Sequence, residues 1–147
     1  MIEDSRKKAR ILLEKAVDFH GHLGPFLVLG IRMGVIARSL LKVQSQDNLS
    51  VVMSIQLSPP VSCTVDGVQV ASGCTLGKGT IRLSEASDRV VGRFRAGDRA
   101  CTIAVRIHVL DQLIESLRKA TDQAILKMAE DVMGRPDADL FEISLAP

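Results

Sequence analysis

Two helical segments meet at residues 19–25, which read Phe19-His20-Gly21-His22-Leu23-Gly24-Pro25. The two glycines disfavour a helix interior, and a proline is well placed in the first turn of a new helix. Before this stretch, apolar residues recur at helical spacing and predict a helix over residues 4–18. After it, apolar residues cover most of a helical circumference, so a second helix, running to about Leu41, is expected to be buried.

The rest of the chain alternates short strands with helices. Gly30 and Gly34 lie one turn apart on the second helix, so another backbone can approach closely there. Strands are expected at 51–57, 80–83, 90–95, 101–107 and 140–145. Helices are expected over 63–70 and, as one long amphipathic helix, over 110–134. The expected fold is a single α+β core domain over residues 1–147, with an antiparallel sheet packed against helices.

Composition excludes several classes of partner. Of 147 residues, 46% are hydrophobic and 24% charged, as in a folded domain. Nineteen basic and 17 acidic residues give a net charge of +2, and Trp and Tyr are absent, so no nucleic-acid partner is expected. No apolar run approaches the roughly 20 residues that span a bilayer, so no membrane association is expected. Three cysteines without a CxxC pair favour reduced thiols or metal ligands in the cytoplasm.

His20 and His22 are candidate metal ligands. Side chains two residues apart share a face in an extended chain, so both imidazoles of a glycine-rich loop can reach one point. Imidazole suits zinc, nickel, copper and iron alike, so the pair does not choose the metal. A helix-capping or core histidine pair is the alternative, and this segment alone leaves both interpretations open.

A second polar segment extends from Cys63 to Gly79. Cys63, Asp66 and Gln69 fall on one stripe of the expected helix and present a thiol, a carboxylate and an amide together. If Cys63 lies in the first turn, the helix dipole is expected to lower the pKa of its thiol. Cys74 follows just beyond the stop at Ser72-Gly73. Taken alone, each cysteine is more often a small buried apolar residue than a ligand.

The end of this segment, Gly73-Cys74-Thr75-Leu76-Gly77-Lys78-Gly79, is rich in glycine. Successive backbone amides and Lys78 could cradle an anion. The spacing is not that of a phosphate-binding P-loop, which has four residues between its glycines and Ser or Thr after the lysine. A tight turn with a solvated lysine is the favoured interpretation.

The two polar segments resemble the signatures of the FmdE family of formylmethanofuran dehydrogenase proteins, and the similarity extends from the first helix to Asp139-Leu140-Phe141-Glu142. The resemblance implies an α+β core, a tightly intertwined homodimer, and a polar cleft where the HxH loop meets the cysteine segments and a metal binds. Many relatives have cysteine where this chain has Gly24, and alanine where it has Gly67, so one candidate ligand is missing here. The zinc finger that some relatives carry is expected to be absent, because no CxxC occurs.

Three functions remain open. The first is a metal-binding accessory protein that binds a divalent transition metal, most simply zinc, with nickel or iron as alternatives. The expected ligands are His20, His22, Cys63 and Cys74. Asp66 and Gln69 would support these ligands by hydrogen bonds. The second is a small thiol-dependent enzyme, and the third is a non-catalytic interaction module.

In the enzyme hypothesis, Cys63 or Cys74 is the nucleophile and His22 its base. Asp66, Gln69, Thr75 and Lys78 would then bind the substrate, with Lys78 holding an anionic group. The family name also implies association with a molybdenum or tungsten enzyme complex that handles one-carbon units. The residues of this chain supply no site for the pterin cofactor of such an enzyme, so that chemistry is not expected from this chain by itself.

Overall fold

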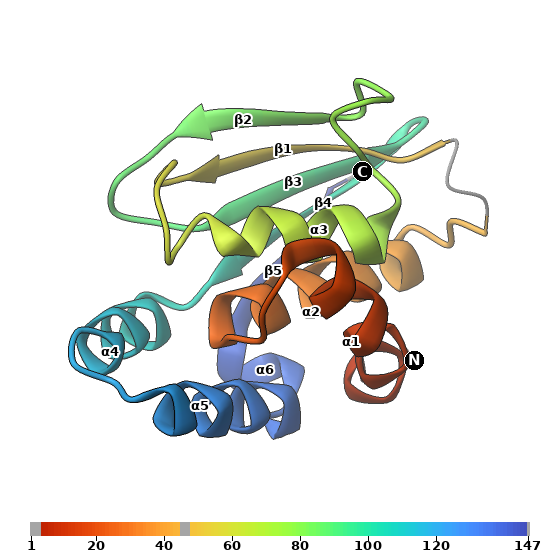
Figure 1. Ribbon diagram of the computed structural model, residues 1–147. Helices are drawn as coiled ribbons and strands as arrows, with labels where there is room; N and C mark the ends of the chain where they lie inside the picture. Colours follow the sequence, from red (N-terminus) through yellow and green to blue (C-terminus); the bar gives the residue numbers. More distant parts are fainter. Residues whose placement is uncertain (1–3, 45–47, 147) are drawn as a thin grey trace.

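Five strands form one sheet in the order β2-β1-β3-β4-β5 (Figure 1). The structure, a computed structural model, describes residues 4–44 and 48–146. The strands are β1 (Ser50–Ile55), β2 (Ile81–Glu85), β3 (Val91–Ala96), β4 (Arg99–Val105) and β5 (Phe141–Ala146). With the helices on one side of this sheet, the expected α+β core is confirmed.

The sheet is mixed, whereas an antiparallel one was expected. Strand β1 pairs with β2 in parallel, and the other three strand pairs are antiparallel. The physical reason is the connection between β1 and β2, which passes through α3 (Cys63–Ser72). A chain that crosses over through a helix returns to the sheet in the same direction, so the second strand lies parallel to the first.

Six helices are present in the described part of the chain. They are α1 (Arg6–His20), α2 (Pro25–Leu40), α3 (Cys63–Ser72), α4 (Ile107–Leu117), α5 (Asp122–Gly134) and α6 (Asp137–Leu140). The prediction of a single helix over 110–134 is therefore wrong, because the chain leaves the helical path between α4 and α5. The hydroxyl of Thr121 accepts a hydrogen bond from the backbone N–H of Ala124 (3.1 Å) and caps a new helix there.

Helix α2 is the centre of the core, and every residue from Pro25 to Ala37 is buried. A Cβ atom at Gly30 would lie 2.0 Å from the carbonyl oxygen of Thr64, and one at Gly34 would lie 2.7 Å from the Cβ of Ala71. The expected close approach at these two glycines is confirmed, and its partner is α3. This contact fixes Cys63, the first residue of α3, relative to the loop that precedes α2.

Arg32 is the one charged residue among the fully buried side chains of the described residues. Its guanidinium donates to Asp137 Oδ1 (2.6 Å), to Ser5 Oγ (2.8 Å) and to the carbonyl oxygens of Val132 (2.8 Å) and Arg135. These bonds join the beginning of α1 to the end of α5. No helix in the described ranges is both long enough and apolar enough to cross a membrane.

Candidate metal centre

The loop between α1 and α2 turns both histidine side chains toward α3. Helix α1 ends at His20, and Gly21 follows with φ 106°, a left-handed conformation that favours glycine. The backbone N–H of Gly21 donates to the carbonyl oxygen of Val17 (2.7 Å). The chain then passes in extended form through Gly24 into Pro25, the first residue of α2. The imidazole ring centroids of His20 and His22 lie 4.5 Å apart.

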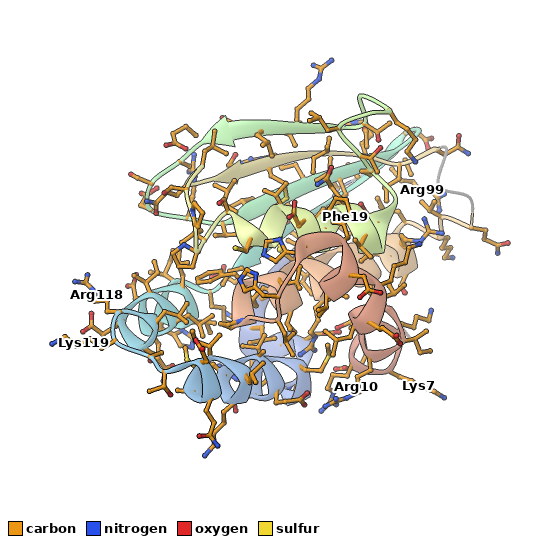
Figure 2. The ribbon with its side chains drawn as sticks, in the orientation of Figure 1. Lys7, Arg10, Phe19, Arg99, Arg118 and Lys119 are labelled. Atoms are coloured by element: carbon orange, nitrogen blue, oxygen red, sulfur yellow. The ribbon has the colours of Figure 1, made fainter. Side chains whose placement is uncertain are left out.

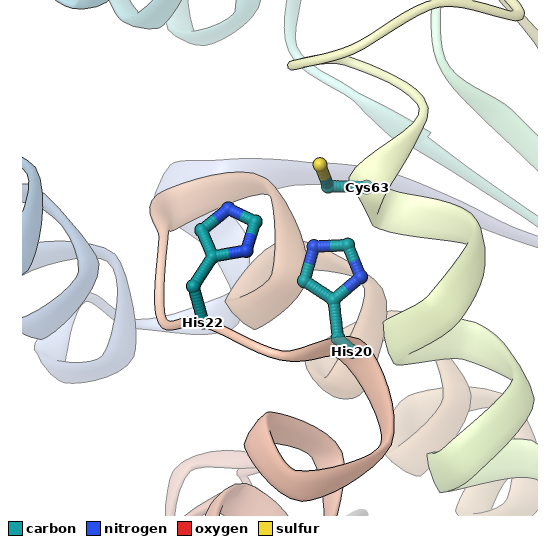
Figure 3. Close-up of side chains that lie close together, drawn as sticks. All are labelled: His20, His22 and Cys63. Carbon is teal, nitrogen blue, oxygen red and sulfur yellow. The ribbon is translucent and has the colours of Figure 1, made fainter.

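Cys63 completes a group of three potential ligands (Figure 3). One donor atom from each of His20, His22 and Cys63 lies within 4.8 Å of the other two. Donors around a tetrahedral zinc ion lie roughly 3.5 Å apart, given Zn–N and Zn–S bonds of about 2.1 and 2.3 Å. Convergence on a metal therefore requires a shift of about 1 Å, which the exposed His22 can supply by side-chain rotation.

His20 is oriented by a carboxylate. Its Nδ1 lies 2.5 Å from Oδ2 of Asp66. Because a carboxylate only accepts hydrogen bonds, Nδ1–H is the donor, and a neutral imidazole with this hydrogen bond has its lone pair on Nε2. The Nε2 atom is buried, and among the described residues it has no hydrogen-bond partner. An unpaired buried nitrogen is costly, and a cation next to it would remove that cost. The carboxylate–histidine pair is the arrangement that commonly supports a metal-bound imidazole.

The support continues beyond Asp66. The side-chain amide of Gln69 donates to Asp66 Oδ1 (3.3 Å), and its oxygen accepts the backbone N–H of Leu76 (3.1 Å). A chain of hydrogen bonds therefore extends from the loop after α3 to the imidazole of His20. The sequence correctly indicated that Asp66 and Gln69 share a helical stripe with Cys63. The contribution of Leu76 could not be predicted from its residue type, because it comes from the backbone N–H.

The pKa of the Cys63 thiol is raised, although Cys63 is the first residue of a helix. Burial is the largest cause, and the nearby Asp66 carboxylate adds to it, while a hydrogen bond from the backbone N–H of Cys63 itself opposes both. The expectation that the helix dipole lowers the pKa of this thiol is therefore wrong for the protein without metal. A bound cation would reverse this balance, because metal coordination deprotonates a thiol.

Cys74 lies apart from the other three candidate ligands. It follows the far end of α3, and a helix of ten residues is about 15 Å long. Its side chain is fully buried, and its thiol donates to the carbonyl oxygen of Leu49 (3.3 Å). Burial also raises the pKa of this thiol. The group that the structure brings together is thus His20, His22 and Cys63.

Thr75 and Lys78 line a different cavity, of about 350 Å³, together with Gln69. Lys15 and Phe19 of α1 complete its wall. The backbone N–H of Lys78 donates to the hydroxyl of Thr75 (3.2 Å), and Gly79 donates to the carbonyl of Leu76 (3.0 Å). Residues 75–79 therefore form a tight turn with an exposed lysine, as favoured above, and none of His20, His22 and Cys63 lines this cavity.

A smaller cavity of about 90 Å³ lies directly beside His20, His22 and Cys63. Apart from these three residues its walls are glycine, proline and apolar side chains, and Leu117 of α4 and Ile125 of α5 close one side. No sequence pattern placed Leu117 or Ile125 at the site. Both occupy apolar positions of the expected long helix and resemble ordinary core residues.

Comparisons with known proteins agree on the region that holds the site. The family model described as "FmdE, Molybdenum formylmethanofuran dehydrogenase operon" matches residues 19–142, which include every candidate ligand. A relative from Archaeoglobus fulgidus, named "Probable S-adenosyl-L-methionine-binding protein", is 35% identical over 130 residues. The matching part is 88% of this chain and 34% of the relative, so the chain spans about one third of the length of that curated relative.

Proposed function

Because this chain belongs to the FmdE family, we propose that it is a metal-binding accessory protein whose ligands are His20, His22 and Cys63. The observation that carries the proposal is the orientation of His20. Its Nδ1 is held by Asp66, and its buried Nε2, which has no partner among the described residues, faces the other two donors. A purely structural histidine at this place would be expected to use both of its nitrogens.

Zinc is the metal that the donor set favours. Imidazole nitrogen and thiolate sulfur are both zinc ligands, and a zinc site with three protein ligands keeps its fourth position open. Nickel and iron are the alternatives, since imidazole and thiolate bind both. When bound, such a cation supplies a Lewis acid at the end of the small cavity. His20 and His22 hold it, Cys63 neutralises one of its charges, and Asp66 keeps the His20 ring in the required orientation.

Metal analysis of protein purified without oxygen tests the proposal. We expect about one zinc, nickel or iron ion per chain, and a large loss of metal in Cys63→Ser and in His22→Ala. Cys74→Ser is the matched control, because Cys74 lies at the other end of α3 and should leave the metal content unchanged. Metal-free wild-type protein that folds normally and takes up no added metal would contradict the proposal.

The raised pKa of the Cys63 thiol argues against the thiol-dependent enzyme considered above. A nucleophilic cysteine needs a thiolate near neutral pH, and burial with the Asp66 carboxylate favours the thiol form instead. Cys74 is buried and hydrogen-bonded to a backbone carbonyl, so it is no better placed. In metal-free protein we expect slow alkylation of Cys63 below pH 9. Rapid alkylation at pH 7 would revive the enzyme hypothesis.

The name of the Archaeoglobus relative supplies a second candidate, binding of S-adenosyl-L-methionine. The cavity of about 350 Å³ beside Gln69 falls in the size range of small-molecule pockets, roughly 300 to 1,000 Å³. Lys15 and Lys78 could pair with the carboxylate of this ligand, and the exposed ring of Phe19 could stack on its adenine (Figure 2). Calorimetric titration checks this: saturable heat that disappears in Lys78→Ala would support binding here, and no heat would reject it.

Two partners belong to the proposal. One is a second copy of the chain. Three apolar side chains lie opposite buried residues on neighbouring strands, and so on the same face of the sheet as the core, yet they are exposed to solvent: Leu83 (45%), Ile143 (40%) and Leu145 (62%). A second chain that adds to the edge strand β5 would cover two of them. Light scattering of the wild type and of Leu145→Glu tests for this dimer. The other proposed partner is a molybdenum or tungsten enzyme complex, and the family description, which names a molybdenum formylmethanofuran dehydrogenase operon, supports the molybdenum form.

A further inference from the structure

The small cavity beside the three ligands lies where a fourth ligand would enter. His20, His22 and Cys63 line it together with Gly24, and among the described residues no other side chain with a donor atom lines it. Gly24 is extended, with φ −150°, and an added Cβ would meet only Cγ2 of Ile125, at the ordinary contact distance of 3.8 Å. The absent side chain at Gly24 therefore leaves usable space next to the ligand group.

We propose that this space is a binding site for a small alkyl thiol, which enters as its thiolate and becomes the fourth ligand beside His20, His22 and Cys63. The inference rests on the proposed metal-binding function and extends it to the class of molecule that the site accepts. No bond within the thiol is broken other than S–H: its proton passes to solvent, and its sulfur takes the open position.

The net charge of the metal and its three ligands determines the charge that the fourth ligand should carry. A divalent cation with two neutral imidazoles and one thiolate carries a net charge of +1. The cavity walls are apolar, and an unbalanced charge next to such walls is unfavourable. A monoanionic donor makes the group neutral. The Asp66 carboxylate also lies near, but it is hydrogen-bonded to His20 and Gln69 and partly exposed to solvent, so its charge is screened.

The kind of atom and the size of the cavity narrow the class further. Sulfur is a soft donor and suits a site that already contains one thiolate. The cavity of about 90 Å³ is far below the roughly 300 Å³ at which drug-sized ligand pockets begin, so only a few atoms fit. Leu117, Ile125 and Pro60 offer contacts to a short alkyl chain and none to a charged or strongly polar one.

Cobalt-substituted protein provides the direct test, because the visible spectrum of Co²⁺ reports the number and kind of its ligands without an activity assay. Titration with ethanethiol should increase the sulfur-to-cobalt charge-transfer absorption by about the amount that one thiolate contributes, with saturation. Glutathione, a bulky and charged thiol, should bind at least tenfold more weakly than ethanethiol. Equal binding of the two thiols would overturn the role of the cavity.

Gly24→Cys is the matched variant, since it places a thiol of the chain itself in the same space. It should show the additional charge-transfer absorption without added thiol and should no longer respond to ethanethiol. The outcomes separate the two proposals. If wild-type protein binds no cobalt, the metal-binding function fails. If it binds cobalt but its spectrum ignores ethanethiol, the metal-binding function survives and the inference about the fourth ligand is overturned.

Discussion

Asp66 is hydrogen-bonded to His20 but is not one of the three proposed metal ligands. Replacement by asparagine keeps the size of the side chain and removes the charge that fixes the proton on Nδ1 of His20. Such supporting partners typically contribute 10- to 100-fold to metal affinity, so Asp66→Asn should weaken zinc binding by a factor of about 10 to 100. Competition with a chromogenic chelator measures this change. Asp111→Asn, at an exposed position of α4, is the control, and equal affinities of the two variants would contradict the assigned role.

The buried thiol of Cys101 leads to a prediction about protein stability at alkaline pH. Burial raises the pKa of its thiol from 9.0 to about 11. Above pH 9 the unfolded chain releases this proton while the folded protein retains it, so the free energy of unfolding should fall as pH rises from about 9 to about 11. The contribution is up to about 3 kcal/mol, from two pKa units at 1.36 kcal/mol each.

Urea unfolding of wild type and Cys101→Ala at several pH values checks this expectation. The variant should be less stable at pH 8, where it lacks the packed side chain, and should lose less stability between pH 9 and 11. Parallel pH profiles for the two proteins would show that Cys101 titrates at an ordinary pKa.

At the scale of the helices, α2 and α3 are held together by backbone contact. A Cβ at Gly67 would lie 2.2 Å from the carbonyl oxygen of Leu27, so Gly67→Ala must push the two helices apart. Overpacking of this kind costs roughly 1 to 3 kcal/mol or more and should exceed the gain of about 1 kcal/mol that alanine offers in a helix. Thermal unfolding should therefore show a lower Tm.

The matched control is Gly134→Ala at the end of α5. A Cβ there would meet nothing within 4 Å, so this variant should be neutral or more stable. If Gly67→Ala were as stable as Gly134→Ala, the close approach of α2 and α3 would be contradicted. Movement of α3 also displaces Cys63, so the Gly67 variant should bind zinc more weakly as well.

Local patterns predicted most of these elements. The glycines and proline of residues 19–25 indicated the break between α1 and α2, and the alternation from Val51 indicated β1. The break before Thr121 was missed, because a continuous amphipathic pattern outweighed a single capping residue. The parallel pairing of β1 and β2 depends on where α3 packs, and the periodicity of a strand contains no information about its neighbour.

Part of the site was also predictable from local sequence patterns. His20 and His22 are close in sequence, and Cys63, Asp66 and Gln69 share one helical stripe, so local geometry indicated each half. The contact between α2 and α3 is what brings the histidine pair and the stripe of α3 together, and local sequence patterns do not identify α3 as the partner in that contact. The structure places Cys74 elsewhere, because the chain turns at Gly73, with φ 78°, toward β2, and no sequence pattern gives the direction of that turn.

At the scale of the whole molecule, Arg32 connects the two ends of the described chain. Its bonds to Ser5 and Asp137 hold α1 against the C-terminal helices. Arg32→Met would keep the apolar volume, remove the guanidinium from three backbone carbonyls, and leave the Asp137 carboxylate with Ser5 as its donor but without its buried cation. Loss of one partner of a buried ion pair typically costs about 3 to 5 kcal/mol, and we expect a loss in that range in chemical unfolding.

Arg10→Met is the control for this prediction, because Arg10 forms an exposed pair with Glu130 (3.4 Å). Surface pairs of this kind contribute at most about 1 kcal/mol. Similar losses in the two variants would mean that Arg32 does not organise the fold.

The central claim is that His20, His22 and Cys63, and not Cys74, bind a metal. X-ray absorption at the zinc edge of the loaded protein counts the ligands directly. We predict two imidazole nitrogens at about 2.0 to 2.1 Å and one sulfur at about 2.3 Å, with an unchanged spectrum in Cys74→Ser. In protein loaded without added thiol, two sulfurs, or a spectrum without imidazole, would contradict the claim.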